Sequence, residues 1–188
     1  MKPRTADFTL VTGNRAKVAE AERILGRSVE AESIDLPEVQ SLDLLEVLEA
    51  KGQEAWQRLR RPLVVEETGL FLEALGGFPG PLVKWMQQAA GSDGIARAAL
   101  ALGDPRAEAR CALLYRNGEQ RIVAVGRDHG ELVLPGRGSD GFGWDPFFQP
   151  TGEAQTVAEL GGCWKDRHGH RGKAWRSLMA KFSAPVGD

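Results

Sequence analysis

The stretch "EARCALLYRNGEQRIVAVG" (Glu108–Gly126) gives the clearest prediction of local structure in this sequence. Two runs rich in β-forming residues flank Asn117-Gly118, a dipeptide that favours the tight turn of a β-hairpin. Along the rest of the chain, short apolar segments alternate with helical patterns. A hairpin inserted into such an alternating series produces a sheet with both parallel and antiparallel strands. The sequence therefore predicts an α/β fold built on a mixed β-sheet.

The remaining elements are predicted from apolar periodicity and from turn residues. Strands are expected at residues 7–11, 29–36 and 62–67, and the last of these ends in two glutamates. Helices are expected at residues 15–26, 41–61, 83–90, 92–103 and 170–182, and a capping box at Thr156 starts a further short helix. No repeat, low-complexity tract or linker divides the chain, so residues 1–188 are expected to form one domain.

The composition restricts the classes of function. The chain has 188 residues, of which 42% are hydrophobic and 27% charged, as is typical of a globular protein. A formal net charge of −2 argues against a nucleic-acid partner, so phosphate must be held by a local cluster of cations. No segment approaches the roughly 20 apolar residues of a membrane span. Cys111 and Cys163 have no motif partner, which predicts reduced thiols and a cytoplasmic protein.

Two segments contain candidate ligands for an anion and a metal. "LVTGNRAK" (Leu10–Lys17) predicts a strand, a turn and a helix start, where free backbone N–H groups attract an anion; a simple capped turn is the alternative. "VVEETG" (Val64–Gly69) places acids at the expected end of a strand. Alternation turns Glu66 and Glu67 to opposite faces, so at most one is expected to face a given site. With Glu38, one of them could hold Mg²⁺, although acids are also common on surfaces.

Two further segments combine loop residues with cations. In "GGFPGPLVKW" (Gly76–Trp85), glycines and prolines fix a loop, and Lys84 stands at the start of the following helix. A cation is unfavourable there unless an anion binds beside it. "KDRHGHR" (Lys165–Arg171) places a cluster of cations and two histidines just before a helix. A basic turn in solvent is the simple interpretation, and a zinc site formed with Cys163 lacks a fourth ligand and a standard spacing.

Taken together, five segments resemble one known family. "TGNRAK", "IDLPEVQ", "EETGLFLEALGGFPGPLVKW", "GFGWDPFFQPTGEAQTVAEL" and "HRGKA" follow one another along nearly the whole chain, and they resemble the inosine triphosphate pyrophosphatase family. The resemblance implies an elongated two-lobed fold around a long, mixed, twisted β-sheet, with a substrate cleft between the lobes, and a homodimer. It also implies that deaminated purine nucleoside triphosphates (ITP, dITP and XTP) are hydrolysed to the monophosphate and pyrophosphate, with Mg²⁺ as cofactor.

The same resemblance implies a role for each candidate site residue. The implied triphosphate ligands are Thr12, Asn14 and Lys17. Other residues implied to bind the substrate are Gly13, Thr68 and the cleft lysines Lys51 and Lys84. The implied Mg²⁺ ligands are Glu38 and Glu67, and Glu67 is also the implied catalytic residue. The implied base-binding residues are Phe142, Gly143, Trp144, Asp145, Lys165, His170 and Arg171.

The family resemblance also gives a physical reason for an aromatic loop. "SDGFGWDPFF" (Ser139–Phe148) carries four aromatic rings, although loops usually lie on the surface. An aromatic ring in a cleft can stack on a purine, and glycines let the backbone approach the ligand. Phe142 is the first candidate for stacking, whereas Trp144 could form the pocket wall. Asp145 could accept hydrogen bonds from the base or order the loop. The last two phenylalanines are expected to begin a strand and to pack inward.

Two positions depart from the family pattern, and two alternative functions are considered below. The family usually has Asp where this chain has Glu67, and usually Ser where this chain has Gly169. The first departure affects the geometry of the catalytic acid, and the second removes a hydroxyl near the base. One alternative is a nucleotide pyrophosphatase of the Maf type, against which "GFGWDP" argues. The other is a nucleotide-binding protein that has lost turnover through the change at Glu67.

Overall fold

A computed structural model of the chain describes residues 7–118 and 120–183. In this part the strands form one seven-stranded mixed sheet in the order β2-β1-β3-β5-β6-β7, and the short β4 pairs with β3. The strands are β1 (Thr9–Val11), β2 (Glu30–Glu32), β3 (Leu63–Leu72), β4 (Pro79–Gly80), β5 (Arg106–Asn117), β6 (Gln120–Leu132) and β7 (Phe148–Pro150). The helices are α1 (Arg15–Leu25), α2 (Leu44–Leu59), α3 (Val83–Ala101), α4 (Val157–His168) and α5 (His170–Ser183).

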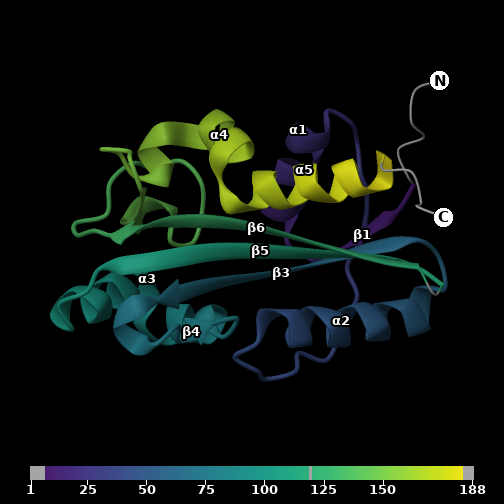
Figure 1. The fold of residues 1–188 in the computed structure, drawn as a ribbon, viewed down its shortest axis with the longest axis horizontal. Coiled ribbons are helices and arrows are strands. Elements are labelled where there is room, and N and C mark those ends of the chain that lie inside the picture. The colour runs from purple at the N-terminus through teal and green to yellow at the C-terminus, as the bar shows by residue number, and fades with distance from the viewer. Residues whose placement is uncertain (1–6, 119, 184–188) are drawn as a thin grey trace.

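The mixed α/β fold that the sequence predicted is confirmed, and the helices cover both faces of the sheet (Figure 1). Helices α1 and α5 pack on one face around Leu10, Val64 and Trp175, which are all buried. Helix α2 packs on the opposite face, around Leu48 and Val65. A third cluster joins α3 and the start of α4 to the far halves of β3 and β5. The molecule is therefore elongated along the sheet, with helices on either side (Figure 1).

Strand β3 is longer than the sequence predicted. The expected end at residue 67 is wrong, because the chain continues in extended form to Leu72 and pairs antiparallel with β5 along its whole length. On the other side of β3, β1 pairs only with Leu63–Val65, and β4 pairs only with Leu70 and Phe71. Between these pairings, residues 66–69 have no strand neighbour on that side in the part of the chain described. This gap in the sheet determines where a ligand can enter.

Most local signals in the sequence are confirmed. Two strands flank Asn117-Gly118 as expected, although both are longer than predicted. The capping box at Thr156 is present, with both of its reciprocal hydrogen bonds to Glu159. The helices expected at 83–90 and 92–103 are one element, α3, which is interrupted by a non-helical backbone at Gly91. The strand expected at 29–36 is reduced to β2, and the helix expected from residue 41 begins after its N-cap, Asp43. In the described residues, no helix is both long enough and apolar enough to cross a bilayer.

Candidate active site

A cavity of about 460 Å³ lies at the gap in the sheet beside β3. Its walls come from both faces of the sheet: from the β1–α1 turn, the segment before α2, α2 itself, β3, and the starts of α3 and α5. The loop before β7 and one residue of α4 complete the lining. Every residue that the sequence analysis assigned to the site lines this cavity, namely Thr12, Gly13, Asn14, Lys17, Glu38, Lys51, Glu67, Thr68, Lys84, Phe142, Gly143, Trp144, Asp145, Lys165, His170 and Arg171.

The β1–α1 turn has the local geometry of a capped helix start. The side chain of Asn14 accepts hydrogen bonds from the backbone N–H groups of Ala16 (3.0 Å) and Lys17 (3.4 Å). The N–H of Asn14 itself donates to the Thr12 hydroxyl at 3.1 Å. These three amides therefore already have partners, as expected if the turn is simply a capped helix start. The ammonium group of Lys17 lines the cavity beside the turn and lies 3.1 Å from Glu66.

The two candidate metal ligands, Glu38 and Glu67, are each paired with a lysine that also lines the cavity. The Lys51 ammonium contacts the Glu67 carboxylate, and Lys84 lies 3.1 Å from Glu38. The donor set suits Mg²⁺, which commonly takes one or two carboxylates and completes its coordination with water and substrate phosphates. No group of three or more His, Cys, Asp or Glu side chains suited to a metal occurs in the described ranges. A metal here would therefore share its coordination with the substrate.

Glu66 lines the same cavity as Glu67, contrary to the expectation that only one of them would face a site. The expectation fails because the cavity lies at the edge of β3, where side chains from both faces of the strand can enter it. Glu66 is only 3% exposed and lies 3.1 Å from both Lys17 and Arg171. Burial alone would raise the pKa of Glu66, but Arg171 and Lys17 outweigh it and hold the pKa below its ordinary value. Glu66 is therefore a buried, ionised carboxylate.

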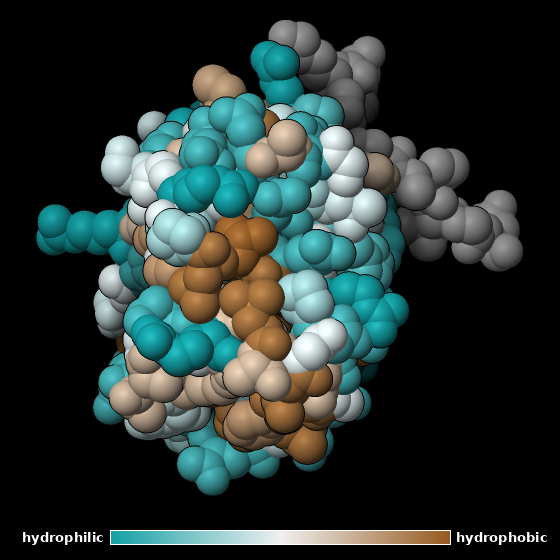
Figure 2. All heavy atoms as spheres, turned by 90° about the vertical axis from the view of Figure 1, so that its left-hand side faces the viewer, coloured by the Kyte–Doolittle hydropathy of each residue, from teal (hydrophilic) through white to brown (hydrophobic). Residues whose placement is uncertain are grey.

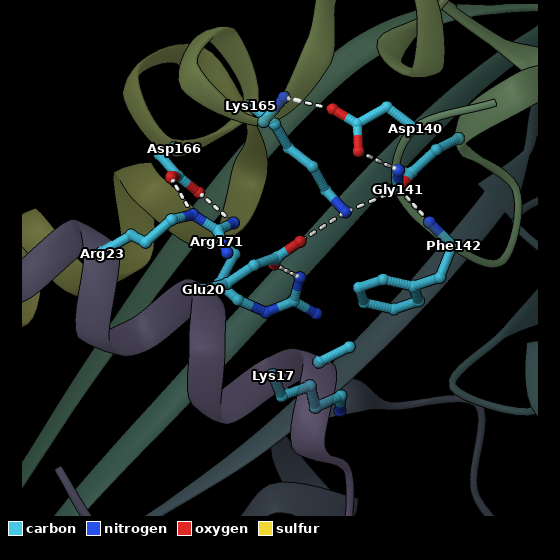
Figure 3. A network of polar contacts seen from close by, with 12 residues as sticks. Lys17, Glu20, Arg23, Asp140, Gly141, Phe142, Lys165, Asp166 and Arg171 are labelled. Atoms are coloured by element: carbon cyan, nitrogen blue, oxygen red, sulfur yellow. Dashed lines mark hydrogen bonds and ion pairs between the residues drawn. The ribbon is translucent and has the colours of Figure 1, made fainter. Parts of the chain in front are cut away.

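A continuous network of ion pairs extends from Glu66 through Arg171 to the aromatic loop, and Figure 3 labels its members Arg171, Glu20 and Lys165. Arg171 of α5 also contacts Glu20 of α1, and Glu20 lies 2.7 Å from Lys165 of α4. Lys165 in turn lies 2.7 Å from Asp145 in the loop. These four side chains are buried, so they hold α1, α4, α5 and the loop in one arrangement. The sequence analysis missed Glu20, whose only signal was a glutamate three residues after Lys17 on the same helix.

The aromatic loop presents Phe142 to the cavity above two cations. The ammonium of Lys165 lies 4.2 Å from the Phe142 ring centroid, and the Arg171 guanidinium lies 5.6 Å from it. Asp145 is 2% exposed and accepts a hydrogen bond from the Phe142 N–H at 2.8 Å. Asp145 therefore orders the loop, which was one of its two expected roles. Burial raises the pKa of the Asp145 carboxyl, and Lys165 opposes this rise.

A family model described as the Ham1 family matches residues 8–181 of this chain. This chain belongs to the Ham1 family. The family resemblance that the sequence motifs indicated is thereby confirmed. The Ham1 protein of Staphylococcus aureus has 24% sequence identity and a TM-score of 0.76, over 93% of this chain and 98% of that one. A HAM1 protein from Coxiella burnetii has 24% identity and a TM-score of 0.77, over 94% and 98%. These two structures share the Ham1 fold.

A third Ham1-like structure carries a functional description. It is the nucleoside-triphosphatase / dITP/XTP pyrophosphatase from Mycobacterium abscessus, which has 29% sequence identity with this chain and a TM-score of 0.68. The match covers 90% of this chain and 97% of that one.

In this Ham1 chain, a close approach between α5 and β6 sets the position of His170. A Cβ atom at Gly126 of β6 would lie 2.0 Å from the His170 carbonyl oxygen, so only glycine permits this contact. His170 is 6% exposed, and its ring stacks on Trp144 at a centroid distance of 6.3 Å. Burial lowers the pKa of His170 well below its ordinary value, and neighbouring Arg171 and Lys165 lower it further. His170 is therefore neutral near pH 7.

The other aromatic residues of the loop pack into the protein. Phe148 is 1% exposed and begins β7, as expected. Phe147 lies in a 3₁₀ turn before the strand and packs half-buried against the same cluster, so it packs inward but does not begin the strand. Trp144 contributes to this cluster and to the cavity wall at once. Trp144 is therefore held by packing against this cluster, whereas Phe142 lines the cavity without belonging to the cluster.

Proposed function

We propose that this protein hydrolyses the deaminated purine nucleoside triphosphates ITP, dITP and XTP to the nucleoside monophosphate and pyrophosphate. The observation that carries the proposal is one cavity lined by four lysines, by the carboxylates of Glu38 and Glu67, and by an aromatic loop. These are the groups needed for a triphosphate, a metal and a base. The description of the Mycobacterium abscessus relative as a dITP/XTP pyrophosphatase supports the same substrate class.

The lysines would hold the triphosphate while water attacks the α-phosphorus and pyrophosphate leaves in line. Catalysis of phosphoryl transfer rests mainly on positioning and on neutralising charge, which Lys17, Lys51 and Lys84 would supply. Glu67 would orient the attacking water and accept its proton. Its contact with Lys51 fixes the direction of the carboxylate. Triphosphate binding would draw Lys51 away from Glu67 and Lys84 away from Glu38, with which they are now paired.

Glu38 and Glu67 would hold Mg²⁺. When bound, the ion supplies charge neutralisation at the phosphates and lowers the pKa of coordinated water. The lysine partners now occupy the carboxylate oxygens that Mg²⁺ would require. Substrate and metal are therefore expected to bind cooperatively. Phosphate oxygens of the substrate can replace the carboxylates as partners of the lysines, which leaves the carboxylates for the metal.

The base would be selected at its 6-position. Hypoxanthine and xanthine carry a keto oxygen there, which a neutral His170 can meet with an N–H group, whereas the adenine amino group would be left badly paired. Arg171 was expected to donate to the base as well. Two of its nitrogens are already engaged, Nε with Glu66 and Nη1 with Glu20, so any donation to the base would come from the third. Phe142 would stack on the purine, with Lys165 on its other side.

We infer that the protein forms a homodimer in the cytoplasm. Figure 2 shows hydrophobic residues gathered on the end of the molecule where α3 finishes and the segment after β6 begins. Leu100, Leu102 and Leu134 are exposed large hydrophobic residues of these elements. A partner subunit on such a surface would remove them from water. Cys111 and Cys163 are both free thiols, which suits a reducing compartment. Sedimentation analysis would determine the subunit number directly.

The decisive experiment compares inosine, xanthosine, adenosine and guanosine triphosphates as substrates in the presence of Mg²⁺. The expected product is pyrophosphate, with kcat/KM for ITP and XTP at least roughly 100-fold above that for adenosine triphosphate. Release of orthophosphate, or equal use of adenosine triphosphate, would contradict the proposal. Tight binding of ITP without any product would instead indicate a nucleotide-binding protein.

A further inference from the structure

We propose that Asp140 is a positioning residue that holds the base-binding loop in register with α4. The inference rests on the proposed function of the loop. Asp140 Oδ2 accepts a hydrogen bond from the backbone N–H of Gly162 at 2.9 Å, across 22 residues of sequence. Its other oxygen, Oδ1, accepts from the N–H of Gly141 at 2.8 Å. One carboxylate thus joins the loop to the helix (Figure 3).

The second half of α4 lies beyond the capping box at Thr156 and has no side-chain cap of its own. The helix is interrupted at Gly161, whose φ of 79° and ψ of 173° are accessible in practice only to glycine. A new helical segment therefore begins at Gly162, and its first N–H groups lack partners within the helix. Helix starts usually satisfy such groups with a neighbouring Ser, Thr, Asp or Asn, but Gly161 and Gly162 have no side chain. Asp140 supplies the missing acceptor from the loop, and its charge also suits the helix dipole.

The two segments that Asp140 joins carry the residues proposed to bind the base. The second half of α4 carries Lys165, and the loop carries Phe142 and Asp145. Asp145 binds Lys165 at 2.7 Å, so the loop meets the helix at two points, Asp140 and Asp145, which flank Phe142 in the sequence. Lys165 lies under the Phe142 ring as a result.

The loop is also held from the other side of the cavity. Ser92 Oγ of α3 donates to the Gly143 carbonyl oxygen at 2.9 Å. This contact fixes the far end of the turn, whereas Asp140 fixes the near end. Asp140 itself does not line the cavity, unlike Phe142, Gly143 and Asp145. It would therefore act through the loop and not on the substrate.

The test is Asp140→Ala, with ITP and inorganic triphosphate compared as ligands. KM for ITP is expected to rise about tenfold while kcat changes little, because misplacing a binding group by about 1 Å can cost up to roughly 100-fold. Inhibition by inorganic triphosphate should be unchanged, since that ligand has no base. Asp140→Asn keeps one carbonyl oxygen and is expected to recover part of the loss. Asp104→Ala is the matched control, because Asp104 also accepts a backbone N–H, from Arg106 at 3.1 Å, away from the cavity.

Hydrogen exchange of the ligand-free protein separates this inference from the proposed function. Asp140→Ala should increase exchange in residues 139–147 and in residues 157–168 together, whatever the substrate is. If only α4 exchanges faster, or if both the exchange rate of the loop and KM for ITP are unchanged, then Asp140 is only a helix cap. Either result would show that the inference is wrong. An equal weakening of ITP and inorganic triphosphate would also overturn it. If the unaltered protein fails to prefer ITP, the proposed function fails, while the exchange result still decides the coupling.

Discussion

Glu66 and Glu67 are adjacent in β3, yet they enter one cavity from opposite faces of the sheet and have different partners. Glu66 is buried against Lys17 and Arg171, on the side of α1 and α5. Glu67 is partly exposed and contacts Lys51 of α2. The arrangement separates two roles that the sequence alone could not distinguish. Glu66 fixes the cations beneath the base loop, and Glu67 is available to a metal and to water.

Replacing Glu67 with Gln is expected to lower kcat by roughly 100-fold or more, as for the loss of an acid–base group. The melting temperature should change little, because the side chain is accessible to the cavity. Glu67→Asp is the sharper variant, since it restores the usual family residue but shortens the side chain. If the cavity has adapted to Glu, Asp will be slower. Steady-state kinetics with ITP measure both variants, and an unchanged kcat in Glu67→Gln would remove Glu67 from the mechanism.

Glu66→Gln is expected to destabilise the protein by about 3–5 kcal/mol, because it removes the buried counter-charge that Lys17 and Arg171 share, although Arg171 still contacts Glu20. The pKa of Glu66 is lowered in the folded protein, so its stabilisation is present above about pH 4.5 and is lost as pH falls through the folded value. The variant should therefore lose less stability than the parent between about pH 5 and pH 3. Denaturant unfolding at several pH values measures this difference. The control is Glu54→Gln, which removes an exposed helical pair with Arg58 and should change stability by less than about 1 kcal/mol.

Phe142→Ala should weaken ITP binding by roughly 1–3 kcal/mol if the ring stacks on the base. Inorganic triphosphate should bind the variant as it binds the parent. Isothermal titration calorimetry with both ligands provides the comparison. An equal loss for the two ligands would show that the ring supports the loop and does not meet the base.

His170 is expected to contribute to acid sensitivity. Its pKa is depressed in the folded protein, so protons bind preferentially to the unfolded chain once pH falls below about 6.5, and stability declines from there toward the folded pKa. His170→Asn should reduce this decline in thermal melts between about pH 7 and pH 5. His168→Asn is the matched control, because His168 is exposed and packs beside Trp164. If the control removes the decline and His170→Asn does not, the wrong histidine has been assigned.

Local chemistry made parts of the fold predictable, and long-range pairing decided the rest. Asn117-Gly118 and Thr156 act on their immediate neighbours, so the hairpin and the start of α4 could be predicted. Thr68-Gly69 resembles a turn, but pairing with β5 keeps it extended, and local propensity could not show this. The residues of the cavity were predicted from family motifs. The partners of Glu66 and Glu20 could not be, because they depend on α1, α4 and α5 meeting at one point.

The gap beside β3 also bears on how the protein avoids aggregation through strand pairing. A strand edge with unpaired backbone groups is a template for another strand, and such pairing leads to aggregation. Strand β3 runs from Leu63 to Leu72 and is largely apolar apart from its acidic pair. Charged side chains along an open edge discourage an incoming strand, which would have to strip them of water and counter-ions. Glu67, the partly exposed acid in this opening, therefore also makes it a poor template for amyloid-like growth.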